Sequence, residues 1–378
     1  MRIGLLLPNS NYVSRLAKDI RQWIDIGLRE GGSNAHELFI ETTTYNESKN
    51  LVRSALQDLL IKQDVDVVVA PLNPAMAADV EDLMGGQEVP LVMLNMGEDI
   101  GVGDTAPPWV FSNSFNLWRS SWLMGQMAVE RYGQNVCVVT TAHAGGYGMA
   151  YAFSLGVESA GGSIACMIPT SMKPDETEVA VKLNSAAELD ADVVMVIAAE
   201  PDLAVFDQVK SKHHNSQPVI GLPPLAFLFN GSDGITWKAD HPVMVGWEPG
   251  NPKSRDFIKR FSRETERPAH AYALLAYETG HLLAKARVSF LEKRNGHVLQ
   301  RALLDAEFDG PRGMIRFDGD HQEIVSQQWQ LEPHNNDNSA VSLPTANLVD
   351  IPDTLNDQVK QARTTMEKQG WLNPYLVA

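Results

Sequence analysis

The sequence has little of what several large classes of protein need. Its 378 residues include 31 Lys and Arg against 47 Asp and Glu, so the formal net charge is −16. Because binding to a phosphate backbone takes clustered Lys and Arg, this charge argues against a nucleic-acid partner. The longest uncharged stretch, residues 132–157, contains amides, a histidine and a glycine-rich turn, so it does not predict a membrane span.

Motifs for nucleotides, metals and catalysis are also missing. There is no Gly-Lys-Ser/Thr of a P-loop, no Gly-x-Gly-x-x-Gly of a dinucleotide fold and no Gly-x-Ser-x-Gly of a serine hydrolase. His213 and His214 are adjacent, so they cannot bind one ion from a common side of a helix. We therefore expect no cofactor, no metal and no enzymatic activity.

The cysteines and the first residues leave the cellular compartment open. Cys137 and Cys166 are the only cysteines, and each lies in an apolar run. We expect both to be core residues with free thiols, although the sequence leaves a bridge between them open. The apolar run after Met1 is too short for a signal peptide and lacks a small-residue cleavage site. Either a leader was removed or the protein stays in the cytoplasm.

Short apolar runs alternate with segments of helical period, which is typical of βαβ units and parallel sheets. The length fits two lobes at about 150 residues per domain. The expected strands are residues 2–7, 65–70, 91–94, 136–140, 163–168, 193–198, 218–221 and 243–247, with further strands around 308–317. The expected helices are 14–30, 47–63, 147–160, 177–189, 201–212, 252–266, 270–288 and 354–368. Residues 332–350 are polar and predict an irregular surface loop.

Several segments stand in a characteristic order. They include Ile-Gly-Leu-Leu-Leu-Pro at 3–8, Val-Val-Val-Ala-Pro-Leu-Asn at 67–73, Tyr-Gly-Met-Ala-Tyr-Ala-Phe at 147–153 and Phe-Asp-Gly-Pro-Arg-Gly-Met-Ile-Arg-Phe-Asp at 308–318. In order and spacing, these segments resemble the type I periplasmic binding proteins of the leucine/isoleucine/valine-binding branch. The resemblance covers nearly the whole chain.

The resemblance implies an α/β fold of two similar, doubly wound parallel-sheet lobes joined by three crossover strands. It places the crossings near residues 115–118, 247–251 and 321–326. The first lobe would comprise residues 1–116 and 250–322, and the second lobe residues 117–249 and 323–378. Because ligands of open α/β sheets bind beyond the carboxyl ends of the strands, two facing sheet edges predict a cleft between the lobes.

Polar and aromatic residues follow the predicted strands, where they would reach that cleft. The candidate ligand-binding residues are Ser10, Asn11, Asn73, Asn95, Glu98, Trp118, Tyr147, Glu200 and Trp247. Each has a structural alternative. Asparagines after strands cap helices and form turns, and the helix dipole favours a carboxylate at a helix start. A tyrosine can cover a helix start, and the two tryptophans at the crossings can pack a hinge.

The sequence departs from the resembled family where amino acids are held. Amino-acid binders of the family carry Ser and Thr in two first-lobe loops, whereas this chain has Asn73 and Asn95 there. The acidic residue usual after a later second-lobe strand is replaced by Pro223 and Pro224. Since an amide both donates and accepts hydrogen bonds, the pattern favours a neutral ligand, such as an amide, a urea-like compound or a polyol, over an aliphatic amino acid.

The resemblance implies the substrate-binding component of an ABC-type uptake system, located in the periplasm or otherwise outside the cytoplasm once a leader is removed. Such a protein closes on a small polar molecule, here an amino acid, an amide or a urea-like compound, and delivers it to a membrane permease. The alternative is a cytoplasmic sensor, since the chain also resembles the amide-responsive regulator of amidase operons in fold and length. The partner would then be a regulatory protein.

Overall fold

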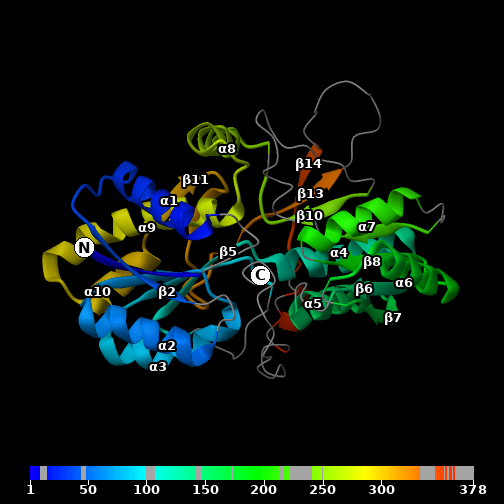
Figure 1. The fold of residues 1–378 in the computed structure, drawn as a ribbon, viewed down its shortest axis with the longest axis horizontal. Helices are drawn as coiled ribbons and strands as arrows, with labels where there is room; N and C mark the ends of the chain where they lie inside the picture. Colours follow the sequence, from blue (N-terminus) through cyan, green and yellow to red (C-terminus); the bar gives the residue numbers. More distant parts are fainter. Residues whose placement is uncertain are drawn as a thin grey trace.

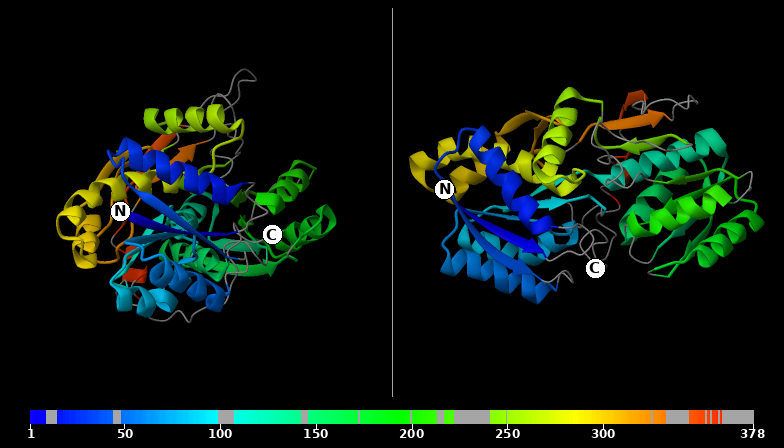
Figure 2. Two further views of the ribbon diagram at one scale, coloured as in Figure 1. Left: turned by 60° about the vertical axis from the view of Figure 1, so that its left-hand side comes forward. Right: turned by 45° about the horizontal axis from the view of Figure 1, so that its top comes forward.

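The computed structural model describes residues 1–8, 15–43, 48–98, 107–141, 146–171, 173–198, 200–212, 217–221, 241–248, 250–324, 326–332, 345–352, 354–355, 357–359 and 361. Two parallel sheets, each with helices on both faces, form the two halves of the molecule (Figure 1). The halves lie beside each other along the long axis, as two further views show (Figure 2).

The first half is built on five parallel strands in the order β2-β1-β3-β4-β5. They are β1 (Arg2–Pro8), β2 (Glu37–Thr43), β3 (Val67–Ala70), β4 (Leu91–Asn95) and β5 (Val110–Ser114). Strands β1, β3 and β4 are almost entirely buried, because helices cover both faces of the sheet. In β1, Ile3 and Leu5 belong to one apolar cluster and Leu6 to the other, so successive side chains serve opposite layers.

The helices of the first half come from two distant parts of the chain. The layer containing Ile3 holds α1 (Leu16–Glu30), α8 (Pro252–Thr265), α9 (Ala271–Lys293) and α10 (Gly296–Leu304). The opposite layer holds α2 (Lys49–Gln57), η1 (Asp58–Lys62), η2 (Pro74–Met76) and α3 (Ala77–Gln87), seen below the sheet in Figure 1. The first half is therefore completed by a segment that follows the second half in sequence.

The second half repeats this plan with four parallel strands in the order β7-β6-β8-β9. They are β6 (Asn135–Thr140), β7 (Ser163–Pro169), β8 (Val193–Ile197) and β9 (Val219–Gly221). One face packs against α4 (Leu117–Tyr132) and α5 (Gly146–Ser159), and the other against α6 (Glu176–Glu188) and α7 (Glu200–Lys212).

Two smaller β units accompany the halves. Strands β10 (Val243–Val245), β13 (Gln328–Glu332) and β14 (Thr345–Val349) form an antiparallel sheet, and β11 (Glu307–Gly310) pairs with β12 (Gly313–Arg316) in a hairpin. The three-stranded sheet lies against α4, where the amide of Met244 contacts the sulfur of Met124 at 3.4 Å. None of the helices within the described residues is long and apolar enough to span a membrane.

Each half contains a helix pair whose close crossing depends on glycine. A Cβ atom on Gly27 of α1 would overlap the carbonyl oxygen of Tyr277 in α9. In the second half, a Cβ atom on Gly156 of α5 would overlap the carbonyl oxygen of Trp122 in α4. The backbones touch at both crossings, so the absence of a side chain sets the distance between the helices.

Periodicity in the sequence predicts most elements with long apolar runs or clear helical period. It does not predict α3, α4, α10, β5, β13 or β2. The last is an edge strand in which exposed Glu37 and half-buried Glu41 interrupt the apolar pattern. Two expectations were wrong. Residues 117 and 118 do not continue a crossover strand, because they open helix α4. The expected irregular tail contains strand β14, whose backbone pairs with β13; residues 333–344 lie outside the described residues.

The expectation of free thiols was also wrong. Cys137 of β6 and Cys166 of β7 form a disulfide. They are register partners on adjacent parallel strands, with their Cα atoms 4.7 Å apart. Cys137 is completely buried, whereas Cys166, on the edge strand, is partly exposed. Apolar runs place both cysteines on strands, but only the strand order brings them together.

We predict that the Cys137→Ser/Cys166→Ser double variant loses about 3 to 4 kcal/mol of unfolding free energy, because the bridge closes a loop between positions separated by 29 residues. Urea titrations of both proteins, with and without reductant, measure this loss. Reductant should lower the stability of the wild type and leave the variant unchanged. Two titratable thiols in the unreduced, unfolded wild type would contradict the bridge.

A polar cluster joins α1 to α8 and α9. Glu30 accepts hydrogen bonds from the Tyr277 hydroxyl at 2.8 Å and from Arg260 at 2.5 Å. The His281 ring stacks on Phe308 with centroids 4.0 Å apart, and its Nε2 lies 3.8 Å from Glu30. Burial lowers the pKa of His281 from 6.5 to about 4. The histidine is therefore neutral in the folded protein at pH 7.

This lowered pKa predicts acid sensitivity. The imidazole of His281 takes up a proton near pH 6.5 in the unfolded protein and only near pH 4 in the folded protein. The contribution of the neutral histidine to the unfolding free energy is therefore intact above pH 6.5 and is lost as the pH falls toward 4. The loss amounts to at most about 3 kcal/mol. Urea unfolding between pH 7.5 and 4 should show a shallower decline in His281→Gln than in the wild type. The exposed-site control His297→Gln should keep the wild-type decline; equal slopes in all three proteins would refute the assignment.

Candidate ligand-binding site

The carboxyl end of β4 presents a buried amide. Asn95 is the last residue of the strand and is completely buried. Its Nδ2 lies 2.9 Å from the Ser112 hydroxyl on β5, and its Oδ1 has no hydrogen-bond partner among the described residues. A buried amide oxygen without a partner costs about 1 to 3 kcal/mol, so such an atom calls for an outside donor.

The loop that follows β4 is fixed to the start of α4. The amides of Leu117 and Trp118 donate to the carbonyl oxygens of Met96 and Gly97 at 3.0 and 2.7 Å. Gly97 adopts a left-handed backbone with φ of 71°. A Cβ atom there would lie 2.6 Å from the Asn116 Cα, so only glycine fits. The loop carries Asn95 and the buried Glu98, and α4 belongs to the other half.

Asn73 follows the neighbouring strand β3 and is 4% exposed. Its carbonyl oxygen accepts the amide of Met76 at 2.9 Å, in the turn that leads into α3. Because β3 and β4 are adjacent and parallel, Asn73 and Asn95 emerge at the same edge of the sheet. The structure thus brings together the first-half asparagines that the sequence singles out, at the sheet edge where open α/β folds bind ligands.

Thr141 follows a parallel strand of the second half and was missed by the sequence analysis. It directly follows β6, is 3% exposed, and its amide donates to the Ile197 carbonyl of β8 at 3.1 Å. Its Oγ1 has no hydrogen-bond partner within the part of the chain that the structure describes. Its place after a strand was a usable signal, since the same rule selected Asn73 and Asn95.

The remaining candidates divide into two groups. Ser10 and Asn11 lie outside the described residues, as do Pro223 and Pro224. Tyr147 and Glu200 lie at the starts of α5 and α7, which follow β6 and β8, but their side chains are not among those described. Both helices nevertheless begin at the carboxyl edge that Thr141 occupies.

Trp118 and Trp247 are each 1% exposed, and both lie where the chain passes between the halves. Trp118 is in the first turn of α4, with the Arg119 guanidinium carbon 4.7 Å from its ring centroid. The Trp247 indole donates to the Ser254 hydroxyl at the start of α8. This burial fits the alternative that the sequence left open, in which the two rings pack the joints between the halves.

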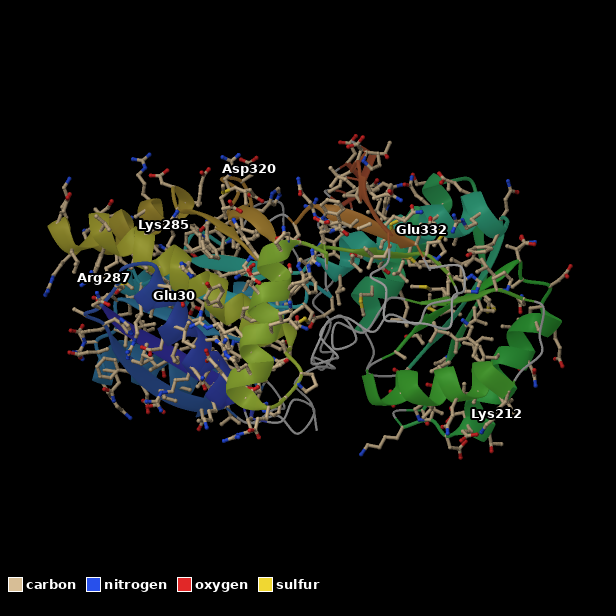
Figure 3. The ribbon with its side chains drawn as sticks, turned by 90° about the horizontal axis from the view of Figure 1, so that it is seen from above. Glu30, Lys212, Lys285, Arg287, Asp320 and Glu332 are labelled. Carbon is tan, nitrogen blue, oxygen red and sulfur yellow. A yellow bond between two sulfur atoms is a disulfide. The ribbon has the colours of Figure 1, made fainter. Side chains whose placement is uncertain are left out.

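The charged groups labelled in Figure 3 lie on the outside of the molecule. Glu30, Lys285 and Arg287 lie on the outside of the first half, and Lys212 at the far end of the second. Among the described residues, no group of three or more His, Cys, Asp or Glu side chains could hold a metal ion. At the two sheet edges, beside the buried Glu98, lie an amide and a hydroxyl, which are neutral groups that can bind a small polar molecule directly.

Comparisons with known proteins agree with this architecture. Residues 1–332 match the family model for periplasmic binding proteins. A Leu/Ile/Val-binding protein homolog 6 of Brucella suis is 21% identical over 355 residues, covering 88% of this chain and 87% of that protein.

Solved structures give the same result. An ABC transporter substrate-binding protein from Sphaerobacter thermophilus superimposes with a TM-score of 0.73 at 21% identity, covering 93% of this chain and 98% of that one. A solute-binding protein of Rhodopseudomonas palustris in complex with 3,4-dihydroxybenzoic acid gives 0.71 at 19% identity, covering 92% and 96%. The fold class and the type I resemblance expected from the sequence are confirmed. The chain belongs to the periplasmic binding protein family.

Proposed function

We propose that this protein is the substrate-binding component of an ABC-type uptake system and acts outside the cytoplasm. It binds a small polar molecule between its two halves, closes on it and presents it to a membrane permease, without catalysing a reaction. The similarity to solute-binding proteins of ABC transporters over more than nine-tenths of the chain supports this role.

The observation that carries the proposal is the pair of unsatisfied buried groups at the two sheet edges. Asn95 ends β4 in the first half, and Thr141 directly follows β6 in the second. Neither Asn95 Oδ1 nor Thr141 Oγ1 has a hydrogen-bond partner among the described residues. A ligand that donates to the amide oxygen and bonds to the hydroxyl would remove both penalties. Both groups are uncharged, which favours a neutral or zwitterionic ligand such as an amide, a urea-like compound or an amino acid.

The disulfide supports the extracytoplasmic location over a cytoplasmic sensor. Disulfides such as Cys137–Cys166 persist in the periplasm and other oxidising compartments and are rare in the reducing cytosol. The two lobes of the proposal are residues 1–116 with 250–322 and residues 117–249 with 323–378. The first lobe contributes Asn73, Asn95 and Glu98, and the second contributes Tyr147, Thr141 and Glu200. The ligand completes its contacts only when the lobes close.

The first test is a thermal screen of the purified protein against amides, ureas, amino acids and polyols. A ligand that binds only the folded state adds about 2.7 kcal/mol at a hundredfold excess over its dissociation constant, so a true ligand should raise the melting temperature clearly. 3,4-Dihydroxybenzoate belongs in the screen because a similar protein binds it. If only aromatic acids stabilise the protein, the role stands and the neutral ligand class is wrong. No response across all classes would count against the role itself.

The second test uses the best stabiliser from the screen in calorimetric titrations. Thr141→Val keeps the shape of the side chain and removes a hydroxyl that has no partner among the described residues, so affinity should fall by about 1 to 3 kcal/mol while the melting temperature of the free protein holds or rises. Asn95→Ala and Asn73→Ala should weaken binding by a similar amount. Thr265→Val, whose hydroxyl bonds within α8, is the matched control with unchanged affinity. Unchanged affinity in Thr141→Val and Asn95→Ala would rule out these contacts.

A further inference from the structure

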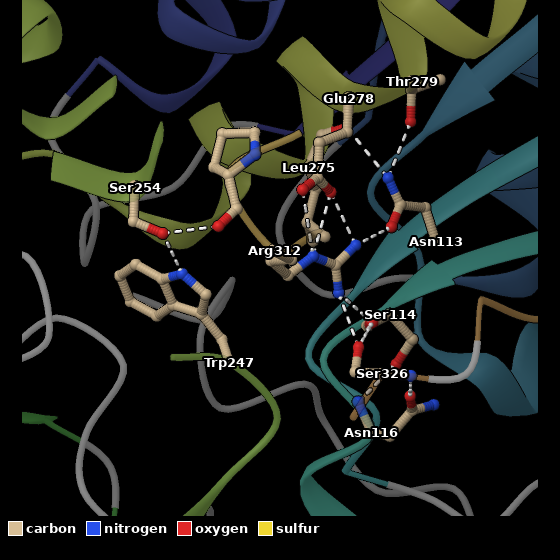
Figure 4. A network of polar contacts seen from close by, with 11 residues as sticks. Asn113, Ser114, Asn116, Trp247, Ser254, Leu275, Glu278, Thr279, Arg312 and Ser326 are labelled. Carbon is tan, nitrogen blue, oxygen red and sulfur yellow. Dashed lines mark hydrogen bonds and ion pairs between the residues drawn. The ribbon is translucent and has the colours of Figure 1, made fainter. Parts of the chain in front are cut away.

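The chain passes between the halves three times, at residues 114–116, 246–248 and 326–327. These three passages meet at one small turn. The β11–β12 hairpin turns through Pro311 and Arg312, and the surrounding polar contacts are drawn in Figure 4. The passages themselves touch. A Cβ atom on Gly246 of the second passage would lie 2.5 Å from the Phe115 oxygen of the first and 3.4 Å from the Ser326 Cβ of the third.

Every N–H group of Arg312 donates a hydrogen bond at the place where the passages meet. Its side chain is fully buried, and it pairs with the equally buried Glu278 of α9, with Nη2 to Oε2 at 2.6 Å and Nε to Oε2 at 3.0 Å. Nη1 donates to the Ser114 carbonyl of the first passage at 2.6 Å and to the Ser326 hydroxyl of the third at 3.0 Å. Nη2 also donates to Asn113 Oδ1. A guanidinium has five N–H donors, and this arrangement gives a partner to each.

The adjacent residue Pro311 holds the second passage. The Ser254 hydroxyl at the start of α8 donates to the Pro311 carbonyl and receives the indole N–H of Trp247. Trp247 lies just beyond β10, so a single serine connects this passage to the turn. Figure 4 shows Trp247 and Ser254 on one side of the turn and Ser114 and Ser326 on the other.

A second bridge joins the first and third passages without Arg312. Asn116 has a left-handed backbone, φ 52°, at the point where the first passage becomes α4. Its Oδ1 accepts the Ser326 amide at 3.1 Å, and its Nδ2 donates to Glu323. The Asn116 amide donates to Ser114 Oγ at 3.0 Å, beside Gly97 of the loop that carries Asn95. These contacts around Arg312 and Asn116 form the joint between the halves, and the joint is therefore directly connected to the loop after Asn95.

The geometry points to the β11–β12 turn as the anchor of lobe closure, with Arg312 as its positioning residue. The turn holds the first and third passages through the Arg312 guanidinium and the second through the Pro311 carbonyl. It thereby keeps the three passages at a fixed mutual position, so the lobes rotate about one point instead of sliding or separating. The anchor sets the distribution of lobe positions before any ligand binds. This inference rests on the two-lobe closure proposed above and adds the element that controls it.

The test measures lobe positions in the protein without ligand. Dyes on Gln87→Cys in α3 and Glu188→Cys in α6, both exposed, report the distance between the lobes by single-molecule energy transfer. The native cysteines are bridged, so they do not take the dyes. The variants are Arg312→Lys, which offers three donors in place of five, and Ser254→Ala/Ser326→Ala, which keeps the ion pair with Glu278 intact. The matched control is Ser121→Ala, a fully buried serine that joins α4 to α5 within the second lobe.

We expect wider distance distributions for Arg312→Lys and for the serine double variant than for the wild type. Ser121→Ala should lower the melting temperature and leave the distribution unchanged. Should Arg312→Lys fail to fold, the serine variant decides alone. A serine variant with the wild-type distribution and only the melting loss of the control would overturn the inference. Failure of the transport role would give a different result: no compound of the thermal screen would then shift the distance distribution of the wild-type protein.

Discussion

The structure depends most on the buried ion pair between Arg312 and Glu278. Two charges in an apolar interior are tolerable only when they are paired and every remaining donor is satisfied. The Arg312 N–H groups that do not bind Glu278 donate to oxygen atoms of Asn113, Ser114 and Ser326. Each of these three residues lies at the end of a strand or in a passage between the halves. Because all of them bind one guanidinium, segments up to 199 residues apart are held at a fixed relative position.

This joint also explains the geometry of the candidate binding loop. The first amides of α4, which in many α/β proteins are free to bind an anion, are already occupied by the carbonyl oxygens of Met96 and Gly97. Helix α4 therefore positions the loop and is not itself available to a ligand. Among the described residues, the Asn95 amide oxygen and the Thr141 hydroxyl are neutral buried groups at the two sheet edges that have no hydrogen-bond partner. The residues that hold the two halves together are thus different from those proposed to bind a ligand.

The two halves share one architecture but are stabilised differently. Each has a parallel sheet between helix layers and a glycine at its closest helix crossing, Gly27 in the first and Gly156 in the second. The first half has five strands and is covered by helices from two distant parts of the chain, residues 16–87 and 252–304. The second has four strands, and its edge strand β7 is tied to β6 by the disulfide. Covalent reinforcement occurs where the exposed edge strand has the fewest buried side chains.

The sequence by itself determined the alternation of strands and helices, because buried runs such as β3 and β8 need continuous apolar residues and the helices between them need an apolar stripe. It also placed Asn73 and Asn95 after their strands, since that follows from order along the chain. Only the tertiary structure decided that Cys137 and Cys166 are partners and that Arg312, within the segment 308–318, holds the passages between the halves. Those facts depend on strand order and on contacts between distant segments, which no local pattern of residues encodes.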